Sequence, residues 1–179
     1  MTVDAISDLD LSYTPPLGSP WDAVQVAAQD WVRAAGPAPA RRPPDRVPTV
    51  LFVCEHNAGR SQLAAGIAAS RAAGRVRVLS AGTNPDAQVD DVMLASLAEL
   101  GIYRGDQVPT RLTADLIAQA DVIVAVKPNL GIVPADGAQL QTWTLPEPER
   151  WDVKGLRPLR DFLDQKVRTL IDGLTRPAR

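Results

Sequence analysis

The sequence is poor in the residues from which disulfide frameworks and metal sites are built. Its 179 residues include one cysteine and one histidine. A single cysteine excludes an intrachain disulfide and favours a reducing compartment. Structural zinc sites take four cysteine or histidine ligands, so the sequence lacks the residues for such a site. The fold must therefore be held together by an ordinary apolar core.

Long apolar segments and a strong charge of one sign are also missing. No run of about 18 apolar residues occurs, which is the length that a membrane-spanning helix needs. Residues 1–4 lack the basic start of a secretory signal, and no apolar segment follows them closely. A net charge of −2 argues against nonspecific nucleic-acid binding, because that binding needs a basic face. We therefore expect a cytoplasmic protein with no nucleic-acid or membrane partner.

The single cysteine opens the most informative segment of the chain, residues 54–61, with the sequence Cys-Glu-His-Asn-Ala-Gly-Arg-Ser. An apolar run at 50–53 precedes it, and a helix-like segment starts at Gln62, so the layout is strand, short loop and helix. Cys54 and Arg60 then place a sulfur nucleophile and a planar guanidinium around one small concavity. Backbone N–H groups and a helix N-terminus complete a cup for a tetrahedral oxyanion. The same surroundings favour the thiolate form of a cysteine, which is the nucleophile.

The other loop residues have roles that their chemistry suggests. Asn57 tolerates left-handed backbone geometry, which turns N–H groups inward, and Gly59 offers the same freedom. Ser61 can cap the helix or hydrogen-bond the sulfur. Glu55 would repel an anion, so its side chain is expected to point away, and His56 is expected to face solvent. The predicted oxyanion-binding set is Glu55, His56, Asn57, Ala58, Gly59, Arg60 and Ser61.

A structural role for the cysteine is the competing interpretation. A lone cysteine on a strand is often just a small buried hydrophobic residue, and a bare spacing of six residues to an arginine arises by chance. The context favours function, because Cys54 ends a strand, the loop contains asparagine and glycine, and a helix begins at once.

Residues 51–62 resemble the signature of the low-molecular-weight protein tyrosine phosphatase superfamily, and specifically its arsenate-reductase branch. Residues 79–85 resemble the turn after the second strand of that family. There the resemblance implies that Ser80 supports Asn57. Residues 120–124 resemble the family's third strand, and residues 143–148 lie where the family has its acid-bearing loop. The resemblance therefore covers roughly residues 48–174 and leaves the N-terminal extension unmatched.

Two departures from the family qualify what the resemblance implies. Glu147 stands where the family has an aspartate before proline, so it is the predicted general acid beside Cys54 and Arg60, with Glu149 and Asp152 as alternatives. Residues 127–131 lack the cysteines that some arsenate reductases use to resolve their intermediate. The resemblance therefore implies an external thiol, such as mycothiol, bacillithiol or glutathione, and a glutaredoxin- or mycoredoxin-like partner.

Hydrophobic periodicity predicts an α/β fold with a four-stranded parallel sheet flanked by helices. The expected strands cover 50–53, 76–79, 122–126 and 140–143, and the expected helices cover 61–73, 89–100, 113–120 and 156–174. In such a sheet the ligand lies at the carboxyl ends of the strands. Residues 48–179 form the predicted catalytic domain. Residues 1–47 form an extension with one helix at about 20–35, a candidate for self-association, and a Pro-rich linker.

Three other side chains have open assignments. Trp143 and Trp151 flank the predicted acid loop, where each could wall the pocket or pack into the core. Lys127, at the end of the third strand, could add positive charge near the site.

Three functions remain open at this point. In the first, Cys54 attacks arsenate, Arg60 and the loop N–H groups hold its oxygens, and Glu147 protonates the departing oxygen. In the second, the same groups form a phosphocysteine that water hydrolyses, as in a low-molecular-weight phosphatase. In the third, the loop only binds an oxyanion and the N-terminal helix mediates assembly.

Overall fold

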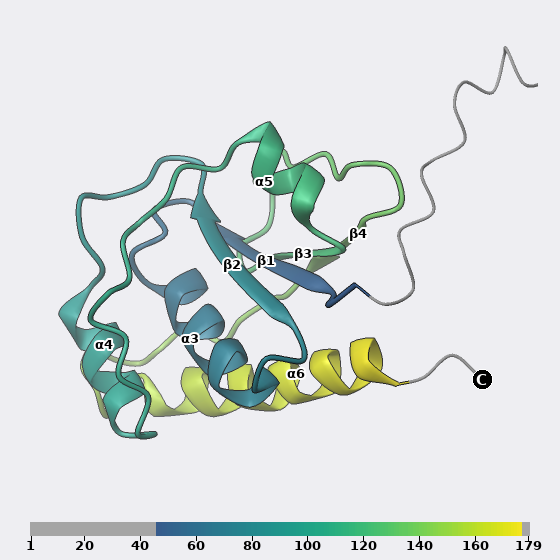
Figure 1. Ribbon diagram of the computed structural model, residues 1–179. Helices are drawn as coiled ribbons and strands as arrows, with labels where there is room; N and C mark the ends of the chain where they lie inside the picture. The colour runs from purple at the N-terminus through teal and green to yellow at the C-terminus, as the bar shows by residue number, and fades with distance from the viewer. Residues whose placement is uncertain (1–45, 177–179) are drawn as a thin grey trace, which may run out of the picture. The chain divides into compact units, whose positions relative to one another are not determined.

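The computed structural model describes residues 46–176 and contains one sheet of four parallel strands (Figure 1). In sheet order the strands are β2 (Arg77–Gly82), β1 (Thr49–Cys54), β3 (Val122–Ala125) and β4 (Gln139–Thr142). The predicted four-stranded parallel sheet is thus confirmed. The predicted helix at about 20–35, its self-association and the Pro-rich linker lie outside the described residues.

Strand β1 lies between β2 and β3, and its position follows from its composition. All six residues of Thr49–Cys54 are buried, as expected for a strand covered on both faces. Its register with β2 pairs Cys54 with Gly82. Strand β4, at the edge, is mostly exposed. The central strand therefore carries Cys54 to the carboxyl edge of the sheet from a fixed, fully packed position.

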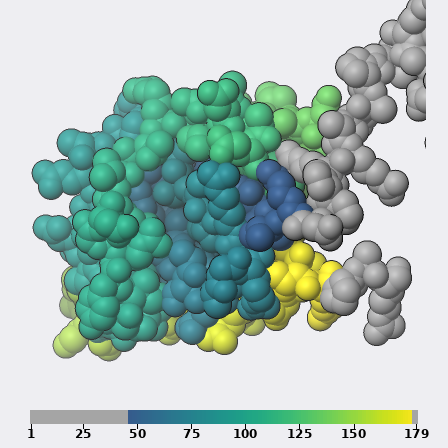
Figure 2. Space-filling model, viewed as in Figure 1, coloured from purple at the N-terminus to yellow at the C-terminus, as the bar shows by residue number. Residues whose placement is uncertain are grey.

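Helices cover both faces of the sheet (Figure 1). On one face, α3 (Arg60–Ala72), α4 (Asp91–Ala98) and α6 (Arg157–Thr175) share a core with side chains such as Phe52 and Val124. On the other face, α5 (Ala114–Gln119) packs over Leu51, Val53 and Ile123. In the space-filling view, the teal and green residues between β2 and α5 cover much of the visible face, with yellow α6 along the lower edge (Figure 2).

Local signals placed the helix ends well. The Thr113 hydroxyl accepts a hydrogen bond from the Leu116 N–H at 3.3 Å, which confirms it as the cap of α5. Asp90 caps α4 by accepting from the Val92 N–H at 2.8 Å. Within residues 46–176, no helix is long and apolar enough to cross a membrane.

A charged cluster ties the end of α4 to the start of α6. The Glu99 carboxylate accepts hydrogen bonds from Arg157 at 2.6 and 3.0 Å and from Arg160 at 2.7 Å. These hydrogen bonds, first from Arg157 and then from Arg160, lower the pKa of Glu99 from 4.5 to about 2. The ion pairs hold together two helices that pack on the same face of the sheet.

Candidate active site

The oxyanion loop, residues 54–60, connects the end of β1 to the first residue of α3. Four of its carbonyl groups are held from the outside by one neighbouring segment, residues 83–90. The N–H groups of that segment donate to the carbonyls of Cys54 (from Thr83, 3.2 Å), Glu55 (from Asn84, 2.8 Å), His56 (from Asp86, 2.9 Å) and Ala58 (from Asp90, 2.9 Å). Because these carbonyls turn outward to residues 83–90, loop N–H groups are free to turn inward.

Gly82 allows the oxyanion loop to lie directly against β2. A Cβ atom at this position would lie 2.6 Å from the Glu55 carbonyl oxygen and 2.9 Å from both the backbone nitrogen and the Cβ of Asn57. Atoms do not approach so closely, so any side chain here would push the loop away. The position next to Cys54 on β2 therefore has to be glycine for the loop to lie this close to the strand.

The Cys54 sulfur is buried and faces two hydrogen-bond donors. The Asn57 N–H donates to it at 3.1 Å, and the Ser61 hydroxyl oxygen lies 2.9 Å away. That oxygen also accepts a hydrogen bond from the Asn57 side-chain amide at 2.9 Å, so the Ser61 hydrogen remains available for the sulfur. Both donors stabilise negative charge on the sulfur. Of the two predicted roles for Ser61, the structure supports the contact with sulfur.

Asn57 organises the inside of the loop. Its φ of 50° is the left-handed conformation that the sequence predicted, and its side chain is fully buried. Its amide oxygen accepts hydrogen bonds from the Thr110 N–H at 2.8 Å and from Gln62 at 3.2 Å. Ser80 lies in the middle of β2, in register with Phe52. Its predicted support of Asn57 stays a prediction, since the contacts described here come from Ser61, Gln62 and Thr110.

Gly59 does not have the left-handed conformation that was predicted, but its backbone still uses the freedom of glycine. Its φ of −119° and ψ of −101° lie outside both the helical and the extended regions that other residues favour. A Cβ there would lie 3.4 Å from the terminal methyl of Met93, an ordinary contact, so packing alone does not require glycine. Gly59 precedes α3, whose N-terminus carries no side-chain cap among the described residues. An uncapped helix N-terminus pointing at the loop fits an anion.

Arg60 lines the pocket and is held by two neighbours. One of its terminal nitrogens donates to both carboxylate oxygens of Glu147, at 2.8 and 2.9 Å. Its guanidinium also lies 5.4 Å from the ring centre of Trp151. The loop after β4 thus reaches the oxyanion loop through Glu147, as predicted from the sequence. The Glu147 carboxylate contacts Arg60, and its predicted role as the acid beside Cys54 stays a prediction.

Glu55 lines the pocket, so the prediction that its side chain points away from the site was wrong. Its carboxylate forms an ion pair with Lys127, and His56 lies 3.9 Å away on its other side. These neighbours, chiefly the hydrogen bond from Lys127, lower the pKa of the Glu55 carboxyl. His56 is half exposed and contacts Asp86 at 3.2 Å, in agreement with the prediction that it faces solvent. Lys127 is therefore at the site, as the sequence suggested.

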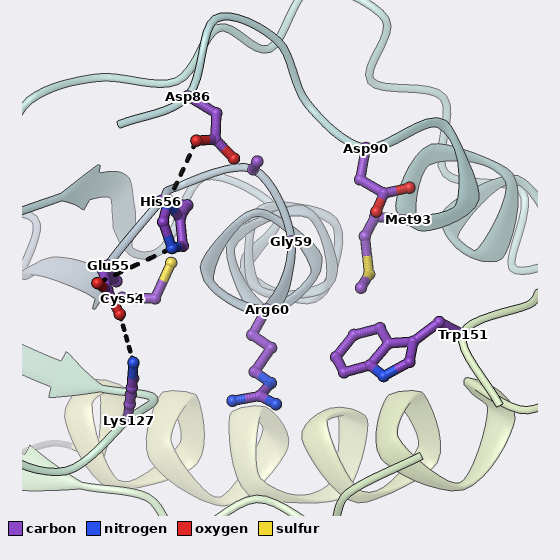
Figure 3. A pocket seen from close by; sticks show the side chains of 11 residues that line it. Cys54, Glu55, His56, Gly59, Arg60, Asp86, Asp90, Met93, Lys127 and Trp151 are labelled. Atoms are coloured by element: carbon purple, nitrogen blue, oxygen red, sulfur yellow. Dashed lines mark hydrogen bonds and ion pairs between the residues drawn. The ribbon is translucent and has the colours of Figure 1, made fainter. Parts of the chain in front are cut away.

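The pocket around these groups has a volume of about 300 Å³ (Figure 3). Cys54, Arg60 and Lys127 line it together, with Trp151 and Met93 as its apolar wall. Trp143 is part of the core instead, packed edge-on against Phe52 with ring centres 5.8 Å apart. The full lining is Cys54, Glu55, His56, Ala58, Gly59, Arg60, Asp86, Asp90, Met93, Lys127 and Trp151.

The alternative acids of the loop after β4 have other surroundings. Asp152 accepts a hydrogen bond from the Gly155 N–H at 2.7 Å and forms an ion pair with Arg150 at 3.3 Å. It therefore shapes its own turn. Glu149 is exposed. Glu147 is the carboxylate of this loop that contacts an oxyanion-loop residue.

A buried cysteine with two hydrogen-bond partners on its sulfur, beside an arginine and the start of a helix, is the arrangement expected of a cysteine-dependent enzyme site for a tetrahedral oxyanion. The comparison with known families agrees. The family model described as low molecular weight phosphotyrosine protein phosphatase matches residues 49–179. The chain belongs to this family of enzymes.

Several known relatives of the chain are named as arsenate reductases. A putative arsenate reductase of Halobacterium salinarum is 26% identical over 126 residues, or 68% of this chain and 89% of that protein. A glutaredoxin arsenate reductase of a Synechocystis species is 27% identical over 125 residues, or 68% and 95%. The structure of the thioredoxin-dependent arsenate reductase of Corynebacterium glutamicum is 26% identical, with a TM-score of 0.65, over 84% of this chain and 73% of that one.

Proposed function

We propose that the protein is an arsenate reductase whose single cysteine forms an adduct with arsenic that an external thiol resolves. The observation that carries this proposal is the arrangement of Cys54. Its sulfur receives the Asn57 N–H at 3.1 Å and lies in one pocket with Arg60. The relatives named as arsenate reductases support the choice of substrate.

In the first step, the Cys54 sulfur attacks arsenic and an S–As bond forms. One oxygen of arsenate leaves as water after it is protonated. Arg60, the loop N–H groups and the N-terminus of α3 bind the remaining oxygens. Arsenic remains in the +5 state, because no electrons have yet been transferred to it.

Glu147 is the proposed source of the proton. Its contact with Arg60 keeps the carboxyl group beside the oxyanion loop. Replacing the family aspartate by glutamate adds one methylene, which lengthens the reach of the side chain. An acid at this position raises the rate by protonating the departing oxygen in the transition state.

The reduction needs two external thiols, since Cys54 is the only cysteine of the sequence. The first thiol, of the mycothiol, bacillithiol or glutathione type, displaces Cys54 from arsenic and restores the free enzyme. A second thiol then attacks the sulfur of the first. A disulfide forms, the S–As bond breaks, and its electron pair stays on arsenic, which leaves as arsenite. A glutaredoxin- or mycoredoxin-like protein would supply that second thiol, and the glutaredoxin and thioredoxin dependence printed for two relatives supports such a partner.

Phosphoester hydrolysis is the second candidate, and the match to the phosphotyrosine phosphatase family model favours it. The same groups would form a phosphocysteine, and water would then release phosphate. This reaction needs no thiol. The two candidates therefore differ in a cosubstrate as well as in substrate.

Turnover of arsenate and of an aryl phosphate, measured side by side, tests the proposal. Each reaction is run without thiol and with mycothiol, bacillithiol or glutathione, with a matching redoxin. The proposal predicts that arsenite forms only when a thiol is present and that one thiol is preferred. Thiol-independent hydrolysis of the aryl phosphate, without arsenite formation, would instead assign the protein as a phosphatase.

A further inference from the structure

The pocket has two cationic side chains, and each is occupied by a carboxylate from a neighbouring loop. Arg60 is bound by Glu147, whose side chain is 71% exposed. Lys127 is bound by Glu55, whose side chain is 40% exposed. Figure 3 shows Lys127 and Arg60 entering the pocket beside Cys54, with Glu55 at the end of the Lys127 side chain. Each of the two cations is therefore already paired with a carboxylate.

A bound oxyanion would need the same donors. One terminal nitrogen of Arg60 already donates to both oxygens of Glu147, so part of its planar fork is taken while Glu147 stays in place. A lysine ammonium is likewise a donor only, and its interaction with Glu55 reduces what it can offer a second anion. Both carboxylates are exposed enough to move off their cations without leaving the pocket mouth, so an exchange of one anion for another is sterically open.

We propose that Lys127 is a second oxyanion-binding cation beside Arg60, and that Glu55 and Glu147 are internal competitors that occupy the two cations until an oxyanion displaces them. This inference rests on the oxyanion site of the proposed function. It assigns Glu55, the residue directly after the nucleophile, the task of limiting how tightly the empty site holds free anions. The lowered pKa of Glu55 fits this task, because the competitor stays charged at neutral pH.

Competition and simple charge repulsion make different predictions. A competitor that must leave before any anion binds weakens the binding of all anions by the same factor. A carboxylate that merely repels the ligand weakens the binding of a doubly charged anion twice as much, on a logarithmic scale, as the binding of a singly charged one. Sulfate and sulfamate separate the two cases, since both are tetrahedral and of similar size but carry two charges and one charge.

The experiment measures the dissociation constants of sulfate and sulfamate from their protection of Cys54 against iodoacetamide. We expect Glu55→Gln to lower the dissociation constants of both anions by the same factor, about two- to fivefold. A change of this size corresponds to the loss of an exposed ion pair. Glu147→Gln should do the same through Arg60. Glu149→Gln removes a nearby exposed carboxylate as the matched control and should change neither constant.

The route through Lys127 is tested by a double-mutant cycle. In a Lys127→Gln background, Glu55→Gln should not increase the affinity for either anion, because the lysine with which Glu55 pairs is gone. The inference would be overturned if Glu55→Gln increased the affinity equally in that background. It would also be overturned if the increase for sulfate were twice the increase for sulfamate on a logarithmic scale. The absence of protection in every variant would overturn it as well. The readout is binding, so a failure of arsenate turnover with these shifts intact would contradict the proposed function alone.

Discussion

Gly82→Ala tests how the oxyanion loop is held in place. The added Cβ would lie 2.6 Å from the Glu55 carbonyl oxygen and 2.9 Å from the backbone nitrogen of Asn57. These neighbours are backbone atoms, so no side chain can rotate out of the way. To reach an ordinary contact distance of 3.4 Å, the Glu55 carbonyl would have to move by about 0.8 Å. Because Asn57 donates to the Cys54 sulfur, that movement would disturb the nucleophile directly.

The size of the effect follows from two separate costs. Overpacking of this kind destabilises a protein by about 1–3 kcal/mol, which lowers the melting temperature by several degrees in a domain of this size. A misplacement approaching 1 Å at a catalytic centre costs on the order of 10²-fold in rate. Turnover should therefore fall about 10²-fold at temperatures where the variant is still folded.

The assay compares Gly82→Ala with Gly105→Ala. A Cβ at Gly105 would meet nothing within 4 Å, so this variant controls for the glycine-to-alanine change itself. Both variants are assayed for thermal unfolding, for arsenate and aryl phosphate turnover, and for protection of Cys54 by phosphate. If Gly82→Ala matched Gly105→Ala in all three, the close approach of the loop to β2 would not matter and the account of the loop would be wrong.

Three further substitutions test the site and the fold. Arg60→Lys keeps the charge but loses the planar fork, so turnover should fall about 10²-fold or more, whereas near-normal rates would show that charge alone suffices. Glu147→Gln should lose about 10²–10³ in turnover of aryl phosphates with poor leaving groups and much less with activated ones; a uniform loss would argue against an acid role. Glu99→Gln should lower the melting temperature above pH 4.5, where the native protein gains stability from the lowered pKa of Glu99. That difference should shrink as the pH falls from 4.5 to about 2, and a pH-independent difference would contradict the assigned ion pairs.

The sequence predicted the features that local patterns encode. The four strands and the helices from α3 onward were predicted to within a few residues at most ends, because apolar periodicity and caps such as Thr113 act over short distances. The pairing of Cys54 with Arg60 came from the same source, since strand, loop and helix follow one another directly. Asn57 was recognised from its tolerance of left-handed geometry.

The contacts that shape the site came from distant segments and left no local signal. Residues 83–90 hold the loop carbonyls through backbone N–H groups, which any sequence could supply. Thr110 binds Asn57 in the same way. Glu55 was predicted to point away because an isolated carboxylate repels anions, and only the fold brings Lys127 to it. Gly59 was predicted to be left-handed, whereas the conformation that it adopts, with φ of −119° and ψ of −101°, depends on how the loop is held.

The nucleophilic role of Cys54 is the central claim, and the turnover of Cys54→Ser is its most direct test. Serine preserves the shape of the loop but offers no anion at neutral pH. Arsenite formation is measured for the native protein and the variant at the same arsenate and thiol concentrations, with sulfate binding followed by calorimetry. The account predicts that the variant still binds sulfate and forms no arsenite. Arsenite formation at the native rate by Cys54→Ser would contradict it.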